Sequence, residues 1–113
     1  MRIRERGREG ERLAEEFFRR GGYEVVARNY RKLSGEIDLV LRKGNTVYFV
    51  EVKVDNPTFR AVERIDDGKL NRMLMTAEAY LSEMGLDGYD VRFILAVVDG
   101  TGVRVVPVDE NLV

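Results

Sequence analysis

Apolar residues recur at helical spacing in two segments of the chain. In residues 9–20 they stand three or four positions apart between charged residues, and Gly21-Gly22 ends the pattern. This predicts an amphipathic helix with a glycine stop. Residues 67–84 show the same spacing up to Gly85, which predicts a second helix. One face of it is expected to hold Leu70, Met73, Leu74, Ala77, Tyr80, Leu81 and Met84, and Met75 is expected to fill the core with Met73 and Met84.

Elsewhere the apolar positions alternate or run together over short stretches bounded by turn residues. Gly44-Asn45 suits a two-residue hairpin turn, and Asp99-Gly100-Thr101-Gly102 turns the chain near its end. The order of elements favours an α/β or α+β fold with helices packed on a central sheet. That order alone leaves the topology open. The predicted strands cover residues 23–30, 36–42, 46–54, 89–98 and 103–108.

Length and composition narrow the class of protein. The 113 residues, 44% of them hydrophobic, suffice for one domain, so we expect a single domain over 1–113 with residues 1–8 as a disordered tail. No apolar stretch is long enough to span a membrane and no signal peptide is recognised, so a cytoplasmic protein is expected. The lack of Cys and His excludes disulfides, histidine triads and the usual zinc sites. Chemistry would have to come from carboxylates, lysines, hydroxyls and bound ions.

Charge is unevenly spread along the chain, although the net charge is only -1. Residues 1–32 hold ten Arg or Lys against six acidic residues, whereas residues 33–113 hold nine against fourteen. A basic flank beside an acidic pocket would suit a metal-dependent enzyme acting on phosphodiesters. A solvated charged surface accounts for the same imbalance, so charge alone does not decide the function.

The predicted central hairpin gathers the charged residues of most chemical interest. If the Gly-Asn dipeptide forms its turn, Asp38 lies directly opposite Glu51, and Glu36 lies opposite Lys53. Side-chain alternation then places these four residues on one face of the hairpin. The same face would also hold Val40 and Phe49, and the opposite, core face would hold Ile37, Leu39, Leu41, Tyr48, Val50 and Val52.

Two carboxylates opposed on an antiparallel pair lie about 4.5 to 5.5 Å apart at Cβ and repel each other. A shared proton, a cation between them or solvent screening would relieve the repulsion. Lys53 is one compensating charge, and Mg²⁺ or Mn²⁺ is another, since hard divalent ions take oxygen ligands. Replacing Asp38 or Glu51 by its amide is therefore expected to raise thermal stability in metal-free buffer. A half-exposed sheet with one charged face shows the same pattern without any site.

A family resemblance rests on these residues. Gly35-Glu36-Ile37-Asp38, followed after twelve residues by Glu51-Val52-Lys53, resembles the Asp…Glu-x-Lys signature of PD-(D/E)XK nucleases. About residues 7–98 are similar to the YraN-like family of small, largely uncharacterised bacterial and archaeal proteins, related in architecture to archaeal Holliday-junction resolvases. This implies a restriction-endonuclease-like αβββαβ core with a mixed central sheet flanked by helices. Further matching residues are Gly10-Glu11, Leu13-Ala14, Gly22-Tyr23-Glu24, Arg28-Asn29-Tyr30, Lys69-Leu70, Ala77 and Tyr80-Leu81.

The resemblance implies a site for Mg²⁺ or Mn²⁺. Asp38 and Glu51 would ligate the ion, and the backbone carbonyl of Val52 would be a further ligand. Glu11, on the first helix, would hold the metal or its water. Lys53 would orient the attacking water or lower its pKa, and would stabilise charge in the transition state. The candidate catalytic residues are therefore Asp38, Glu51, Lys53 and Glu11.

The chain departs from the superfamily pattern in two places. Ile37 stands where the proline that names the superfamily precedes the aspartate, and Val54-Asp55 stands where the family tends to have Thr-Arg. The second departure removes a phosphate contact for which Arg60 or Arg64 is a replacement. The candidate nucleic-acid contacts are Arg28, Tyr30, Arg60 and Lys69, with a packing role as the alternative for Tyr30.

Two functions follow from these residues and the resemblance. The first is a metal-dependent endonuclease that hydrolyses DNA phosphodiester bonds, with branched or damaged DNA as candidate substrates. The second is a non-catalytic module on a nuclease fold that binds nucleic acid or a protein partner. The likeness to resolvases also implies a homodimer. Cleavage of DNA in the presence of Mg²⁺ or Mn²⁺ would separate the two functions.

Overall fold

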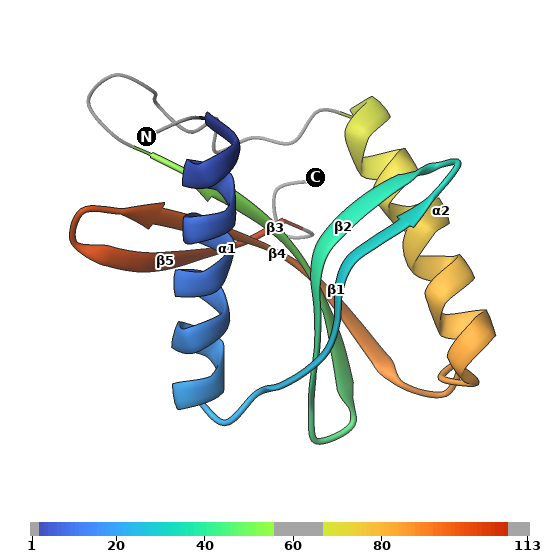
Figure 1. The fold of residues 1–113 in the computed structure, drawn as a ribbon. Coiled ribbons are helices and arrows are strands. Elements are labelled where there is room, and N and C mark those ends of the chain that lie inside the picture. Colours follow the sequence, from blue (N-terminus) through green and yellow to red (C-terminus); the bar gives the residue numbers. More distant parts are fainter. Residues whose placement is uncertain (1–2, 56–66, 109–113) are drawn as a thin grey trace.

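The five strands of the protein form one mixed sheet between two helices (Figure 1). The structure is a computed structural model that describes residues 3–55 and 67–108. The sheet order is β1-β2-β3-β4-β5, antiparallel throughout except for the parallel pair β3 and β4, which α2 connects. The predicted α/β class with a mixed, helix-flanked sheet is confirmed. The elements are α1 (Ile3–Arg20), β1 (Glu24–Lys32), β2 (Gly35–Lys43), β3 (Thr46–Val54), α2 (Asp67–Met84), β4 (Asp90–Asp99) and β5 (Gly102–Pro107).

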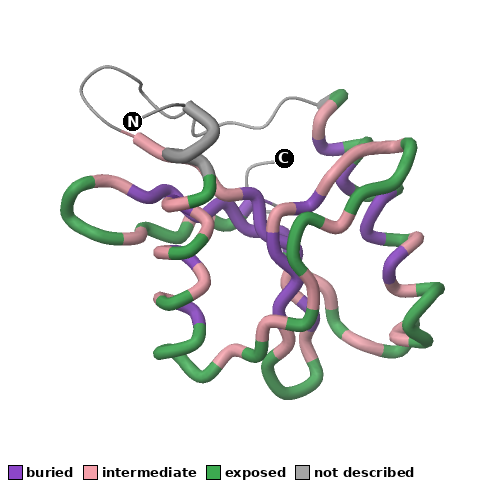
Figure 2. Tube along the Cα trace, viewed as in Figure 1, coloured by how far each residue is buried: buried purple, intermediate pink, exposed green. Residues whose placement is uncertain are grey.

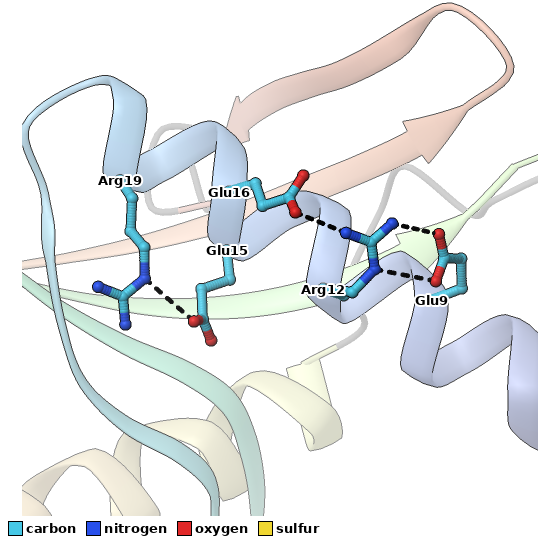
Figure 3. A network of polar contacts seen from close by, with 5 residues as sticks. All are labelled: Glu9, Arg12, Glu15, Glu16 and Arg19. Atoms are coloured by element: carbon cyan, nitrogen blue, oxygen red, sulfur yellow. Dashed lines mark hydrogen bonds and ion pairs between the residues drawn. The ribbon is translucent and has the colours of Figure 1, made fainter.

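Helix α1 begins earlier than its hydrophobic pattern predicted. It starts at Ile3, so residues 3–8, which the sequence suggested as a disordered tail, are helical. Ion pairs between side chains three and four residues apart run along the helix, and pairs of this kind favour an isolated helix (Figure 3). The helix ends as predicted at the glycine pair, where Gly22 takes a φ of 87° and Tyr23 N–H donates to the Phe18 carbonyl at 3.0 Å.

Each face of the sheet carries its own apolar core, because a helix covers each one. Buried residues are concentrated in the middle strands (Figure 2), and β4 is accordingly an almost continuous apolar run. None of the described helices is apolar enough over its length to cross a membrane. The core under α1 contains Ala14, Phe18, Leu39, Leu41, Val50, Ile94, Ala96 and Val98. The core under α2 contains Ile37, Val40, Val47, Phe49, Leu70, Met73, Ala77, Tyr80, Phe93, Leu95, Val97 and Val108.

Two predictions about the core are wrong. Ile37 packs on the α2 side with Val40, whereas strict alternation placed it with the opposite face. The ladder from β2 to β3 runs only from Lys43 to Leu39, so alternation is not maintained beyond that point. On α2, Leu74 is 37% exposed, Met75 is 60% exposed and Met84 is 55% exposed, because the stripe that faces the sheet is narrower than the apolar pattern.

Candidate functional site

The candidate site lies where β2 and β3 stop pairing through their main chains. Their register runs from the turn to Leu39 opposite Val50 and confirms the predicted hairpin. One step further, the Asp38 side chain replaces the main chain: its Oδ2 accepts the Val52 N–H at 2.7 Å. A carboxylate is thus inserted between two strands at the end of their ladder, next to Glu51.

The Asp38 carboxyl is in an environment that disfavours its negative charge. Burial, and then the charge of Glu51, raise its pKa from 3.8 to about 7, against the opposing effect of the Val52 hydrogen bond. The charges of Glu11 and Glu36 raise the pKa further. The charges of three carboxylates, from α1, β2 and β3, therefore act on the Asp38 carboxyl group. The sequence predicted this proximity for Asp38 and Glu51.

Glu51 is a buried carboxylate held by two ammonium groups. Its residue is 8% exposed, and the same oxygen, Oε1, lies 2.7 Å from Lys69 Nζ and 3.3 Å from Lys53 Nζ. Burial acts to lower the pKa of Lys69, but the hydrogen bond and charge of Glu51 outweigh it, so the pKa is raised. Lys53 comes from β3 itself, whereas Lys69 comes from the first turn of α2. Of the predicted site residues, Glu51 and Lys53 are thus in contact, and Lys69 joins them at the same carboxylate.

Asn29 is a residue of this site that the sequence analysis did not single out as functional. Its side-chain Nδ2 donates to Glu11 Oε1 at 3.1 Å and to Glu36 Oε1 at 3.2 Å. Its φ of 48° lies in the left-handed region, which Asn tolerates better than most residues. Arg31 also binds Glu36, at 2.7 Å. Asn29 thus ties the α1 carboxylate to the β2 carboxylate, and its only sequence signal was its place in the family-like Arg-Asn-Tyr run.

Gly10 allows α1 to approach β3 closely enough for Glu11 to reach the site. A Cβ on this glycine would lie 2.6 Å from Val54 Cγ2, which is closer than nonbonded carbon atoms come. The approach therefore needs a residue without a side chain. The neighbouring Glu11 is carried with the helix to the end of the hairpin where Asp38 lies.

The donor set fits a hard divalent cation as a pair of carboxylates. Asp38 and Glu51 offer oxygen ligands on adjacent strands, and burial, followed by the charge of Glu51, raises the pKa of Asp38. No three acidic side chains of residues 8–55 and 68–108 are already close enough to share an ion. Glu11 is bound by Asn29, and Glu51 by its two lysines. Mg²⁺ commonly uses one or two carboxylates, with water and substrate phosphate completing its shell.

A hollow of about 300 Å³ adjoins the site along α1 and β1. Three guanidinium groups line it, and one of them, from Arg28, is held by Glu15 through contacts of 2.5 and 2.9 Å. Charge-assisted bonds of this kind fix the orientation of a guanidinium. The predicted nucleic-acid contact Arg28 therefore borders the hollow together with the candidate metal residue Glu11. The lining residues are Arg8, Glu11, Arg12, Glu15, Arg28 and Leu39.

The other predicted nucleic-acid contacts lie elsewhere. Tyr30 donates its hydroxyl hydrogen bond to Glu83, and its ring meets the Tyr80 ring edge to face at 5.1 Å. These contacts give it the packing role that the sequence had offered as the alternative. Lys69 is bound to Glu51 within the carboxylate cluster. Arg60 and Arg64 lie outside the described residues.

The fold and the site together define an α/β protein whose mixed five-stranded sheet carries carboxylates and lysines at one end of its central hairpin. Residues 10–98 match the model of the Uncharacterised protein family UPF0102, and the chain belongs to that family. The UPF0102 protein of Kosmotoga olearia is 44% identical over 78 residues, covering 69% of this chain and 68% of the relative. The relative in Persephonella marina is 36% identical over 97 residues, covering 83% of this chain and 84% of its own length. The relative in Thermotoga maritima is 41% identical over 81 residues, covering 72% of this chain and 75% of its own length.

Proposed function

We propose that this chain is a metal-dependent endonuclease of the PD-(D/E)XK type that hydrolyses DNA phosphodiester bonds. The observation that supports it most is the insertion of the Asp38 carboxylate between two strands beside Glu51. The Lys53 ammonium group contacts the carboxylate of Glu51. A merely solvated charged face would leave these groups open to water. Here Glu51 is buried, and burial raises the pKa of Asp38 to about 7. Branched or damaged DNA is the substrate class that the resemblance favours.

The residues take the following roles in the proposal. Asp38 and Glu51 would hold Mg²⁺ or Mn²⁺, with the Val52 carbonyl and Glu11 as further ligands. The ion would supply Lewis acidity toward a phosphoryl oxygen and a more acidic water. Lys53, which contacts the Glu51 carboxylate, would orient the attacking water and stabilise negative charge on the phosphate in the transition state.

Cleavage assays on defined DNAs test the proposal. Purified protein with Mg²⁺ or Mn²⁺ is incubated with single-stranded, duplex, nicked and four-way junction DNA, and nicking is followed on denaturing gels. We expect cleavage that EDTA abolishes and that Lys53→Ala reduces by about 10²-fold or more. Lys43→Ala is the matched control, since Lys43 stands at the turn end of the same hairpin and bonds the Gly21 carbonyl. Cleavage that survives in Lys53→Ala, or in EDTA, would reject the proposed site.

A non-catalytic nucleic-acid-binding module is the second candidate. The hollow beside α1 favours it, because three of its six lining residues are arginines, and guanidinium groups recognise phosphate whether or not a bond is cleaved. Fluorescence anisotropy with labelled DNA at two salt concentrations would test binding separately from cleavage. If wild type binds with a salt-dependent affinity that Arg28→Ala weakens, yet cleaves none of the DNAs, the second function replaces the first.

A further inference from the structure

Lys69 contacts the candidate metal site although it has no part in the Asp…Glu-x-Lys signature. Its Nζ is closer to Glu51 Oε1 than that of Lys53, at 2.7 Å against 3.3 Å. Its side chain is 31% exposed, so the ammonium lies at the rim of the cluster with its long stem running from α2. The negative charge of Asp38 also favours its charged form.

We propose that Lys69 is a resident cation that holds the place beside Glu51 in the metal-free protein and moves to the substrate phosphate when a divalent ion binds. The inference rests on the proposed function, because it names a second lysine that acts on the same phosphodiester. In the metal-free state the ammonium compensates the buried carboxylate. In the loaded state it is a donor to a non-bridging phosphate oxygen.

When an ion binds to Glu51, electrostatic repulsion displaces one of the two ammonium groups from this carboxylate. An ion ligated by Glu51 adds two positive charges beside Lys69, and like charges at contact distance repel strongly where water is partly excluded. Lys53 lies two residues along the same strand as Glu51. Lys69 Nζ is the closer of the two ammonium groups to Glu51 Oε1, at 2.7 Å against 3.3 Å, so an ion that takes this oxygen competes with Lys69 first. Lys69 is therefore the group that moves on its flexible stem.

The position of the displaced ammonium follows from its anchor. The first turn of α2 does not move with the side chain, so Lys69 Nζ stays within the reach of its stem from Glu51. A phosphate bound to the ion brings negative oxygens into that same region. Its charge would replace the interaction that Lys69 loses, so substrate and ion together would hold the lysine in its second position.

Titration of Mn²⁺ by calorimetry tests the inference without depending on cleavage. We expect Lys69→Gln to bind Mn²⁺ about threefold or more tightly than wild type, because the competing charge at Glu51 is gone. The same variant should cleave DNA about 10²-fold more slowly, because a donor to the phosphate is missing. A residue with a merely structural role would not combine tighter metal binding with slower cleavage.

Control variants separate this effect from a general change of charge or fold. Lys43→Gln removes the same charge at the far end of the hairpin, and its Mn²⁺ affinity should equal that of wild type. Circular dichroism and melting in EDTA show whether Lys69→Gln is folded. If it is not, Lys69→Met, which keeps the apolar stem, takes its place.

The outcomes distinguish this inference from the proposed function. Mn²⁺ affinity that is unchanged or weaker in the Lys69 variant overturns the resident-cation role. Tighter binding with undiminished cleavage overturns the phosphate contact. If neither protein binds Mn²⁺, the inference and the metal site fall together. Tighter binding in a protein that cleaves no DNA supports the resident cation and rejects only the nuclease.

Discussion

The Asp38 carboxylate accepts the Val52 backbone N–H at 2.7 Å, at the point where main-chain pairing between β2 and β3 has ended. The side chain satisfies a donor that a continuing ladder would have bonded to a carbonyl. This arrangement holds the Asp38 carboxyl group against β3, near Glu51. The Asp38 carboxylate supplies the hydrogen-bond acceptor that the Val52 N–H needs. Its negative charge is disfavoured by burial and by the charge of Glu51.

Asp38→Asn should stabilise the metal-free protein at neutral and alkaline pH. Burial and the charge of Glu51 raise the pKa of Asp38 from 3.8 to about 7, so the folded state prefers the protonated form. The contribution of Asp38 to the free energy of unfolding is complete below about pH 4, and it is lost as the pH rises through 7 and the carboxyl group ionises. Asparagine stays neutral and its side-chain oxygen still accepts from Val52. In EDTA at pH 8 we expect a gain of about 1–3 kcal/mol in the free energy of unfolding.

Urea unfolding of both proteins between pH 4 and pH 8 measures this gain. Wild type should lose stability relative to the variant over that range, and the two curves should meet near pH 4. A constant offset at all pH values would show that the effect is not the ionisation of Asp38. Added Mg²⁺ should restore wild type at pH 8 more than it does the variant, since the ion stabilises the ionised form.

Glu51→Gln should not share this gain, contrary to the expectation from the sequence alone. The repulsion between Asp38 and Glu51 is offset by two ammonium groups that contact Glu51 Oε1. Replacing this carboxylate by an amide would leave both lysines without their negatively charged partner. We expect a loss of about 1 kcal/mol in EDTA at pH 8, because these lysines are only partly buried. Thermal melting of the two single variants side by side is the measurement. A higher melting temperature for Glu51→Gln would show that repulsion dominates at this carboxylate as well.

The fold was predictable because its signals are local. Period-two and helical patterns located the helices and strands, and the Gly44-Asn45 turn set the register of the hairpin from Lys43 opposite Thr46 to Leu39 opposite Val50. The predicted pairs, Asp38 opposite Glu51 and Glu36 opposite Lys53, lie beyond the end of that ladder. The departure of Ile37 from that pattern was not predictable, since it depends on where the ladder to β3 ends. Alternation describes a continuous strand and fails where a side chain replaces the main chain.

Residue spacing along the chain predicted only the part of the site that lies on the hairpin. Asn29 reaches Glu11, and Lys69 reaches Glu51, each across 18 residues of sequence. Such contacts depend on which end of a helix lies over which strand, and no spacing along one chain encodes that. Lys69 was expected from the sequence only as a candidate nucleic-acid contact. Its partner became visible only with α2 placed against the sheet.

Asn29 should be replaceable by glycine more easily than by aspartate. Its φ of 48° suits glycine, which keeps the backbone but removes the bridge between Glu11 and Glu36. Aspartate would instead place a third carboxylate against two others. We expect Asn29→Asp to be about 0.5–1 kcal/mol less stable than Asn29→Gly at pH 8. Chemical unfolding at pH 8 and pH 4 gives the comparison, and the difference should vanish at the lower pH, where carboxylates protonate.

Gly10→Ala should destabilise the protein even though alanine is the better helix former. The new Cβ would lie 2.6 Å from Val54 Cγ2, and the stiff valine cannot turn away without leaving its rotamer. We expect a net loss of about 1–3 kcal/mol, larger than the ~1 kcal/mol that helix propensity returns. The double variant Gly10→Ala with Val54→Ala removes the clash. If contact with Val54 is the cause, the double variant should be more stable than the sum of the single effects allows. Strictly additive losses would place the cause elsewhere in α1.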